Sequence, residues 1–512
     1  MAASADIKFK ESLLTALRCL NLGTLTLRKE QENAVKNVVV RKKDVLVVLP
    51  TGFGKSLIFQ MLPFVFDSWL YTNGSFILVV SPLNALMRDQ IIKLDNLNVK
   101  TLIIRCGDSV SDADIQGIAQ AKFRIIYGHP EAFLGNLRKV LDSDQVREKM
   151  RAVVVDEAHL IEEWQTGIIN KISRILTLHQ DVYFLLITSV NSFLFSKIVD
   201  MAVENCEKSL LDRLSVAHLK AKNFRPAYAQ LSMLSALFPK VPIVALTAAA
   251  TERTGRAISS SLGMTDPVTI AVNPNRSNIF YTASRRQHSG DDKIEVLLLP
   301  YIAKLKDMRE QMPLTVFYSN LQICGECFSI FDHHFGVEQY TPKGSLKLAK
   351  NRLFAQFHAT YPEKEKNDIL DDLIKGPGKI RVLFVTVAFG IGVDCPHIRE
   401  VVHIGVPSTM EEFFQESGRV GRDGKPAVSR VFFNSYDISK AKEHLQHVMR
   451  NFVTTSDCRR KIILEYFGFS LPVSEGECTL HLCCDNCAAT CCCGDCQIKA
   501  RLDTTMNQLA IS

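Results

Sequence analysis

The chain has 512 residues, 47% of them hydrophobic, and a formal net charge of +7. This length is enough for about three domains, and the apolar content argues against a disordered chain. The mild basic excess permits a polyanionic partner without identifying one. The amino-terminal stretch mixes acids and bases, unlike a signal peptide, and the most apolar later stretch, 182–195, is too short to span a bilayer. We therefore expect a soluble, intracellular protein with no membrane partner.

Short β-branched runs alternate with longer amphipathic stretches in two series. The first series consists of "DVLVVLP" (44–50), "SFILVVSP" (75–82), "FRIIYGHP" (123–130), "AVVVDEAH" (152–159) and "PIVALTA" (242–248). The second consists of "LTVFYSN" (314–320), "KIRVLFVT" (379–386), "REVVHIGVP" (399–407) and "SRVFFN" (429–434). Strands that alternate with helices predict parallel sheets covered on both faces. We expect two α/β domains, at 1–275 and 276–440, then a helical module at 441–490 and a cysteine-rich tail at 491–512.

A glycine-containing turn, "LPTGFGKS" (49–56), separates the first expected strand from an expected helix. Gly52 and Gly54 allow a tight turn whose N–H groups point at phosphate oxygens, and the following helix adds its dipole. Lys55 can reach terminal phosphates and Ser56 can ligate Mg²⁺. The first glycine of the full P-loop pattern is replaced by Leu49, so an ordinary turn is the alternative. The candidate nucleotide-binding residues of this turn are Thr51, Gly52, Gly54, Lys55 and Ser56.

The run 152–159 ends in two acids and an imidazole rather than in ordinary turn residues. Open α/β sheets place their ligand crevices at the carboxyl ends of strands. A P-loop nucleotidase needs a strand-end acid for the Mg²⁺ water shell and a base for the attacking water, and Asp156 and Glu157 fit these roles. The alternative is that both acids only cap a helix.

Two arginines lie far downstream in "QESGRVGRDG" (415–424). Guanidinium groups stabilise the negative charge that develops in phosphoryl transfer. Arg419 and Arg422 are three residues apart and would share one face of a helical turn, next to Gln415. A solvated basic surface would explain the arginines equally well.

These motifs occur in the order found in RecQ-type DNA helicases of the DEAH-bearing superfamily 2, which the chain resembles over residues 27–487. The resemblance implies two tandem RecA-like domains, with ATP between them, and a zinc-binding module. From "LRKEQ" (27–31), it implies that Arg28 and Gln31 contact adenine, although Leu27 replaces the usual aromatic residue. It also implies that Asp394 organises the nucleotide side and that His159 links the hydrolysis site to the second domain.

The same resemblance assigns strand contacts. "SPLNALMRDQ" (81–90) and "YGHPE" (127–131) resemble strand-tracking motifs, which implies DNA contacts at Ser81 and Tyr127, and Thr386 is implied to lie near the DNA. "TAAAT" (247–251) resembles the motif that couples hydrolysis to DNA, with Ala249 in place of a threonine.

A long interruption follows Trp164, which should begin an aromatic-rich loop that senses single-stranded DNA. The far half of this loop is represented by Phe224 and Arg225, whose side chains suit base stacking and phosphate contact. The family has about three residues between the two halves, whereas here 59 residues intervene. The extra segment, about 168–222, is interpreted first as a gene-model artefact or splice product; a surface domain and a disordered loop are the alternatives.

Nine of the 15 cysteines lie between Cys458 and Cys496, which in a reducing compartment indicates metal ligation. By resemblance to the RecQ zinc module, the expected zinc ligands are Cys458, Cys478, Cys484 and Cys487, with Cys483 as a substitute for Cys478. A rival quartet is Cys484, Cys487, Cys493 and Cys496. The adjacent basic residues are expected either to face duplex DNA or to lie on a solvated helix face; they are Arg459, Arg460 and Lys461.

The sequence therefore predicts an enzyme that uses ATP, Mg²⁺ and Zn²⁺. By resemblance it is a 3′–5′ DNA helicase of repair or recombination, acting on single strands and fork or duplex junctions in the nucleus. One alternative is a nucleic-acid-binding ATPase scaffold with impaired unwinding, supported by the interrupted loop, by Ala249 and by the short stretch after Cys487. Another is an RNA helicase. No particular protein partner is indicated.

Overall fold

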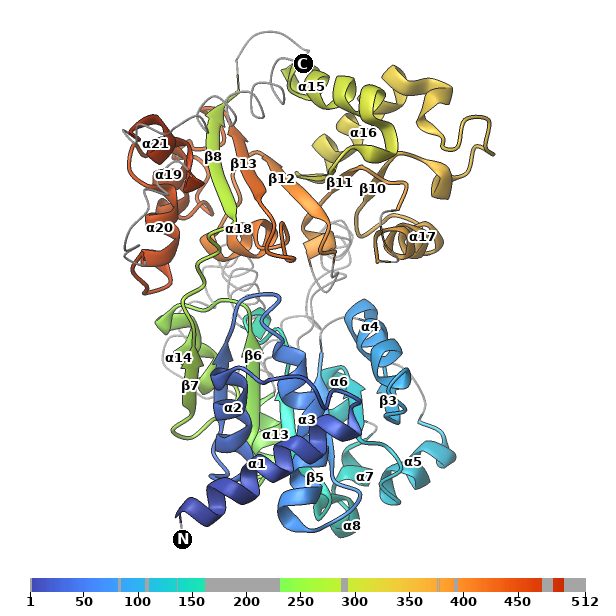
Figure 1. Cartoon of the computed structure of the whole chain (residues 1–512), viewed down its shortest axis with the longest axis vertical. Helices are drawn as coiled ribbons and strands as arrows, with labels where there is room; N and C mark the ends of the chain where they lie inside the picture. The colour runs from blue at the N-terminus through green and yellow to red at the C-terminus, as the bar shows by residue number, and fades with distance from the viewer. Residues whose placement is uncertain are drawn as a thin grey trace, which may run out of the picture.

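The structure, a computed structural model, describes residues 2–81, 84–105, 110–135, 137–161, 231–286, 293–374, 376, 378–390, 395–471 and 482–491. Two α/β domains follow one another, and a small helical module lies beside the second (Figure 1). In the described ranges, no helix is both long enough and apolar enough to cross a membrane. The predicted α/β fold with two parallel sheets is confirmed.

The first domain is built on a seven-stranded sheet in the order β3-β4-β2-β5-β6-β1-β7. Every pairing in it is parallel. Its strands are β1 (Val45–Val48), β2 (Phe76–Val80), β3 (Thr101–Ile104), β4 (Ile125–Gly128), β5 (Met150–Val155), β6 (Ile243–Thr247) and β7 (Val268–Ala271).

Helices cover both faces of this sheet. One face buries Val45 and Val47 against α1 (Ala2–Cys19), α2 (Lys29–Val39) and α3 (Lys55–Leu70). The opposite face buries Leu46 and Val48, because successive side chains of a strand point to opposite sides. The helices with buried residues in this second cluster are α5 (Asp112–Ala119), α6 (Pro130–Leu134), α7 (Arg138–Leu141), α8 (Asp144–Arg147), α13 (Ser232–Leu237) and α14 (Glu252–Ser261). α4 (Asn84–Asp95) lies beside β3.

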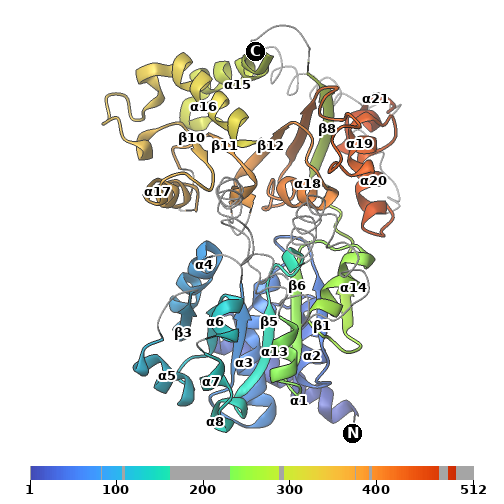
Figure 2. The same ribbon diagram turned by 180° about the vertical axis from the view of Figure 1, so that it is seen from behind.

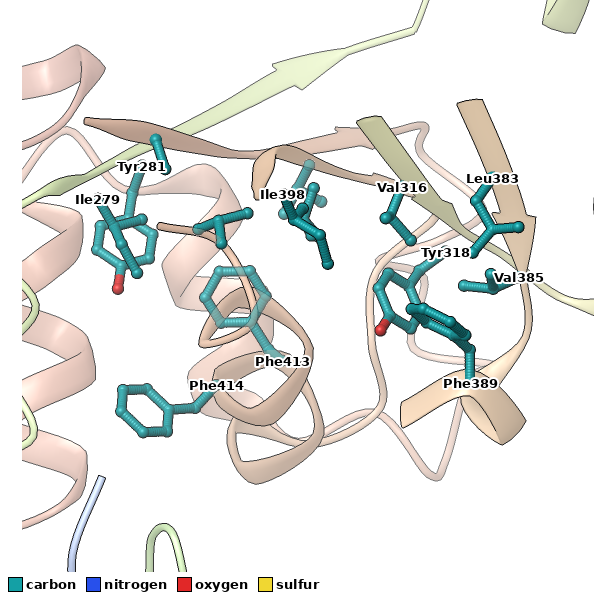
Figure 3. Packing of buried hydrophobic residues seen from close by; sticks show 14 of the residues in the cluster. Ile279, Tyr281, Val316, Tyr318, Leu383, Val385, Phe389, Ile398, Phe413 and Phe414 are labelled. Carbon is teal, nitrogen blue, oxygen red and sulfur yellow. The ribbon is translucent and has the colours of Figure 1, made fainter. Parts of the chain in front are cut away.

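The second domain is built on a six-stranded parallel sheet in the order β10-β11-β9-β12-β13-β8. One face packs against α15 (Lys293–Met308) and α16 (Leu321–Phe335). The other packs against α17 (Glu363–Ile374) and α18 (Met410–Ser417), where Phe413 lies beneath the strands (Figure 3). The strands are β8 (Ile279–Arg285), β9 (Leu314–Tyr318), β10 (Phe354–Phe357), β11 (Val382–Val385), β12 (Ile398–Ile404) and β13 (Ala427–Phe433). Short 3₁₀ turns lie at Arg309–Gln311, Gly336–Gln339, Ala349–Asn351 and Val387–Gly390.

The helical module shares the core of the second domain. It consists of α19 (His447–Thr454), α20 (Arg459–Tyr466) and α21 (Asp485–Ala489), all of which lie against edge strand β8 (Figure 2). Met449, Ile463 and Cys487 belong to the same buried cluster as Phe413. The module is therefore fixed to the second sheet by hydrophobic contacts.

Candidate active site

The P-loop lies between β1 and α3, where the sequence predicts it. Gly52 and Gly54 have φ of +83° and +84°, in the left-handed region that favours glycine. The Lys55 ammonium donates to the Leu49 carbonyl over 2.9 Å. Burial lowers the pKa of Lys55, and the nearby charges of Glu157 and Asp156 oppose this shift. The lysine is thus held at the strand end, close to both acids.

The Gln31 carboxamide joins α2 to the P-loop. Its oxygen accepts from the Arg28 backbone N–H over 2.9 Å, and its nitrogen donates to the carbonyls of Phe53 and Gly54 over 3.2 and 3.1 Å. The Arg28 guanidinium lies 4.1 Å from the centre of the Phe53 ring. A Cβ on Gly54 would lie 2.6 Å from the Gln31 nitrogen, so glycine is required for this close approach.

The Ser56 hydroxyl takes part in a half-buried chain of hydrogen bonds. It accepts from Gln90 Nε2 over 3.3 Å, and Gln90 Oε1 accepts from Gln60 Nε2 over 2.7 Å. Gln90 is 7% exposed and lies on α4, which carries part of the predicted strand-tracking motif. One lone pair of the Ser56 oxygen is therefore occupied, and the other remains for a cation.

Two carboxyl groups follow the end of β5. Burial, and then the neighbouring Glu157, raise the pKa of Asp156 to about 7, while Lys55 opposes the shift. Glu157 has φ of +51°, which is rare for a residue with a Cβ and costs about 1–3 kcal/mol. Its N–H donates to Asp156 Oδ1 over 3.0 Å. The turn thus places both carboxyl groups beside the P-loop lysine.

His159 connects this turn to the end of β6. Its Nδ1 lies 3.1 Å from Thr247 Oγ1 and 3.4 Å from Glu157 Oε2. The Thr247 hydroxyl donates its single hydrogen to the Ala249 carbonyl in a hydrogen bond of 3.0 Å. Thr247 Oγ1 therefore accepts from His159 Nδ1–H. Burial lowers the pKa of His159, which favours the neutral imidazole.

The second domain contributes positive charge to the same site. Arg422 lies near enough to Lys55 to help depress the pKa of that lysine. Arg419 and Arg422 both flank Tyr318, whose pKa is raised by burial and lowered in part by these two charges. Both arginines lie in turns beyond the end of α18 at Ser417, not on the helix itself. On α18, Gln415 has a buried Nε2 with no hydrogen-bond partner among the described residues, so it is a donor that a ligand could engage.

The residues predicted to touch DNA are placed differently. Ser81 and Tyr127 are each 1% exposed, with hydroxyl oxygens that are buried and unpaired in the described part of the chain. In this conformation the two side chains are therefore not accessible for the expected direct contact with a DNA strand. Thr386 is half-buried directly after β11. Outside the described residues lie Trp164, Phe224, Arg225, Asp394, Cys478 and the segment 168–222.

Four thiols of the helical module come together. The sulfur atoms of Cys458, Cys483, Cys484 and Cys487 all lie within 4.8 Å of one another, as four ligands of one small ion would. Four thiolates in a tetrahedron are a usual donor set for structural zinc. Hydrogen bonds from Cys458 and Cys483 lower the pKa of Cys484. Cys458, Cys484 and Cys487 belong to the expected ligand set. The fourth sulfur is that of Cys483, which the sequence offers as a substitute for Cys478.

The expectations for the basic residues of α20 are wrong at two positions. Arg459 and Arg460 are 4% and 5% exposed, so neither faces a duplex or solvent. Arg459 pairs with Asp485 at 2.6 Å and donates to the Phe452 carbonyl. Arg460 donates to backbone carbonyls of the segment between the two domains. Lys461, in contrast, is exposed and lies 3.7 Å from Glu465.

Sequence reasoning missed several residues that shape the site, namely Gln60, Gln90, Arg276 and Tyr318. Gln90 is part of a motif quoted above, but the sequence contains no sign of its bond to Ser56. Tyr318 ends a predicted strand, where a polar side chain at a carboxyl end is a usable signal.

Three family models match consecutive parts of the chain. A DEAD/DEAH box helicase model matches residues 28–195, a helicase conserved C-terminal domain matches 328–424, and a RecQ zinc-binding model matches 429–488. The last match includes the whole thiol cluster.

The curated relatives are helicases. The "Bifunctional 3'-5' exonuclease/ATP-dependent helicase WRN" of Mus musculus is 26% identical over 92% of this chain and 29% of its own length. The "ATP-dependent helicase SGS1" of Saccharomyces cerevisiae is 26% identical over 90% and 27%. The "Putative ATP-dependent DNA helicase Q1" of Caenorhabditis elegans is 27% identical over 85% and 58%. The chain thus spans less than two thirds of the length of these relatives.

Solved structures share the fold at low identity. The DUF1998 helicase MrfA bound to DNA has a TM-score of 0.57 at 15% identity, covering 85% of this chain and 52% of its own. Dbp5 of S. cerevisiae bound to RNA and ADP BeF3 has a TM-score of 0.54 at 14% identity, covering 89% and 91%. With helicase models on both α/β domains and the RecQ zinc-binding model on the helical module, the chain belongs to the RecQ family of DEAD/DEAH-box helicases.

Proposed function

We propose that the protein is an ATP-dependent DNA helicase that moves 3′ to 5′ along a single strand and separates duplexes at forks or tailed junctions. The observation that carries this proposal is electrostatic. Arg422 of the second domain lies near enough to Lys55 of the first to help lower the pKa of that lysine, and the charges of Glu157 and Asp156 act on the same lysine. A nucleotide bound there would touch both domains, so its hydrolysis would change their separation.

The residues divide into three roles. Lys55 binds the terminal phosphates with the N–H groups of 51–56, while Ser56 and Asp156 hold Mg²⁺, which would neutralise phosphate charge. Glu157 orients the attacking water, and Arg422, Arg419 and Gln415 stabilise the charge that develops on the γ-phosphate. Arg28 and Gln31 bind adenine, with Asp394 on the nucleotide side, and His159 connects hydrolysis to the second domain.

Zinc is proposed to be held by Cys458, Cys483, Cys484 and Cys487. The donor set and the mutual distances of the four sulfur atoms support this choice. Zinc would act structurally here, because four thiolates close its coordination shell.

A strand is proposed to cross both domains near Thr386, Trp164, Phe224 and Arg225. The names of relatives that act on DNA support a DNA partner, and nuclear residence would follow from that substrate. A neighbour bound to RNA makes RNA the comparison to test.

The test is ATP turnover with no nucleic acid, with single-stranded DNA and with single-stranded RNA, followed by unwinding of duplexes that carry a 3′ or a 5′ tail. We expect stimulation by DNA and unwinding of the 3′-tailed duplex, both abolished in Glu157→Gln. Turnover without strand separation would instead favour the ATPase scaffold. Stronger stimulation by RNA would indicate an RNA helicase, and preference for the 5′ tail would overturn the polarity.

A further inference from the structure

The helical module of α19–α21, which the RecQ zinc-binding model matches and which is called the zinc module below, holds one side of the segment that joins the two domains, residues 273–279. This segment follows β7 of the first sheet and leads into β8 of the second. Arg460 of α20 donates to Asn275 Oδ1 over 2.9 Å and to the carbonyls of Arg276 and Ile279. The same guanidinium donates through Nε to Cys483 Sγ over 3.2 Å. One buried side chain therefore contacts both a cluster sulfur and the joining segment.

The other side of this segment holds the loop that carries the two arginines of the site. Arg276 donates to the carbonyls of Gly418, Val420 and Gly421 over 3.4, 3.0 and 2.6 Å. Asn278 donates to the carbonyls of Gly421 and Lys425, each over 2.8 Å. These bonds bracket Arg419 and Arg422 on both sides in the sequence.

The fit at Gly421 shows how closely the two backbones approach. Its φ is +55°, and a Cβ there would lie 2.5 Å from Asn278 Nδ2 and 2.7 Å from the Lys425 carbonyl. Bonds from a guanidinium are about twice as strong as neutral ones, and their fork geometry fixes direction. The backbone of 418–425 is thus oriented by side chains that lie outside the nucleotide site.

We propose that Arg460 and Arg276 are positioning residues that link the zinc module to the loop bearing Arg419 and Arg422, with the joining segment 273–279 between them. This inference rests on the proposed ATPase function. The zinc module holds the Arg460 guanidinium, which fixes the backbone carbonyls of 275–279. Arg276, within that segment, in turn fixes the backbone of the loop 418–425. Loss of the link displaces the arginines that stabilise the reaction while leaving the P-loop intact.

The chain supplies a matched control. Arg459 precedes Arg460 on the same helix and is equally buried, yet its partners are Asp485 and the carbonyls of Phe452 and Ala283, none of which belongs to 273–279. Arg459→Lys should disturb the module about as much as Arg460→Lys without touching the joining segment. A difference between the two variants isolates the link from general loosening.

The experiment compares Arg276→Lys, Arg460→Lys and Arg459→Lys in the full chain. For each, kcat and KM for ATP are measured, together with Kd for ADP, Kd for ADP with beryllium fluoride, zinc content and Tm. Because small displacements of reacting groups cost up to about 100-fold, we expect kcat to fall by about 10- to 100-fold in the first two variants. Affinity for ADP with beryllium fluoride should fall with kcat, while Kd for ADP and zinc content stay near wild type. Arg459→Lys should lower Tm and leave the ratio of the two Kd values unchanged.

The double variant provides a second criterion. If the two arginines act through one path, Arg276→Lys with Arg460→Lys should cost about as much as the worse single change, since coupled residues are not additive. Additive losses, or an equal effect of Arg459→Lys, would overturn the link. If a buried variant does not fold, Asn278→Ala removes two bonds to the same loop without burying a charge, and a normal kcat in it would also reject the link.

Failure of the proposed function gives a different pattern. A wild-type chain without ATP turnover, or an Arg422→Ala variant with normal turnover, would reject the ATPase site itself. An active wild type, an inactive Arg422→Ala and a normal Arg460→Lys would reject only the link.

Discussion

The imidazole of His159 donates to the Thr247 hydroxyl over 3.1 Å, and this bond ties the ends of β5 and β6 together. The Thr247 hydroxyl donates its own hydrogen bond to the carbonyl of Ala249, whose methyl group is buried with the core of the second domain. A continuous path of contacts therefore leads from Glu157, which lies 3.4 Å from His159, to the other domain. This path supports the proposal that His159 transmits the state of the hydrolysis site.

Thr247→Val should weaken this transmission. Valine keeps the shape but cannot accept from His159, so the buried Nδ1–H is left with Glu157 as its remaining partner. We expect stimulation of ATP turnover by single-stranded DNA to fall by about tenfold, with a smaller loss of basal turnover and a stability loss of about 1–3 kcal/mol. Thr254→Val on α14 is the control, because Thr254 is also buried and its hydroxyl bonds to Thr251 rather than to His159. Equal loss of basal and stimulated turnover would show that the bond serves hydrolysis alone.

Gln90→Leu should change the Mg²⁺ requirement. The substitution removes the donor that orients the Ser56 hydroxyl, without changing the P-loop backbone. We expect the Mg²⁺ concentration for half-maximal ATP turnover to rise about fivefold, the equivalent of about 1 kcal/mol for one hydrogen bond. Gln60→Leu removes only the outer bond of the chain and should have a smaller effect. An unchanged Mg²⁺ requirement in Gln90→Leu would contradict this role.

Asp156 should make the metal-free protein less stable as pH rises. Its pKa is raised to about 7 in the folded state by burial and by Glu157, against 3.8 as the ordinary value. Between about pH 4 and pH 7, the folded state therefore holds a proton that the unfolded state has released, and stability falls as pH rises. The slope is limited to about 1.4 kcal/mol per pH unit for one group.

The measurement is urea unfolding in EDTA at several pH values, with Asp156→Asn as the comparison. The wild type minus variant difference in unfolding free energy should decrease as pH rises through this window. Groups elsewhere titrate equally in both proteins and cancel. A difference that is flat, or that increases with pH, would contradict the raised pKa.

Cys483→Ser should lose zinc. Its sulfur lies within the cluster of four, and replacement leaves three ligands and an open position. We expect zinc content to fall from about one ion per chain and Tm to drop, since a structural metal stabilises the fold directly. Cys493→Ser and Cys478→Ser should retain zinc. Loss of zinc in Cys478→Ser with retention in Cys483→Ser would restore the set first inferred from the sequence.

The sequence identifies central strands well and edge strands poorly. Each of the nine apolar runs overlaps a strand, and the four strands that the runs leave out are β3, β7, β8 and β10, the edges of the two sheets. Central parallel strands are buried on both faces and therefore appear as continuous apolar runs. Edge strands such as β7, with the sequence "VTIA" and two exposed residues, lack this signal.

Each motif of the nucleotide site is visible in the sequence because the residues within that motif are adjacent along the chain, in a short turn after a strand or, for Arg419 and Arg422, after α18. The contacts made by Arg460 and Gln90 are not visible, since their partners are backbone carbonyls and a hydroxyl about 30 to 180 residues away. A run of basic residues ordinarily indicates a surface that is exposed to solvent. Only the tertiary structure shows that carbonyls of the joining segment replace water around Arg460.

Deletion of 168–222 remains a test of the interrupted loop. The described residues on either side of the interval 162–230 are Ile161 and Leu231, which are fully buried in one cluster with Ala158 and Leu234. Because the chain leaves and re-enters the same core, a short connection can replace the long one. Shortening the interval about fivefold lowers the loop-closure cost by about 1.4 kcal/mol.

We expect the deletion to raise DNA-stimulated ATP turnover, because it brings Trp164 near Phe224 and Arg225 in the sequence, close to the separation that the RecQ resemblance implies. Turnover is measured with and without single strands in the full-length and shortened chains, with Lys55→Ala in both as the background. If the segment is foreign to the fold, the shortened chain should also keep or increase its Tm. Unchanged or lower stimulation would reject the interpretation of 168–222 as a gene-model artefact or splice product, since its removal would then bring no gain in coupling between the strand and Glu157.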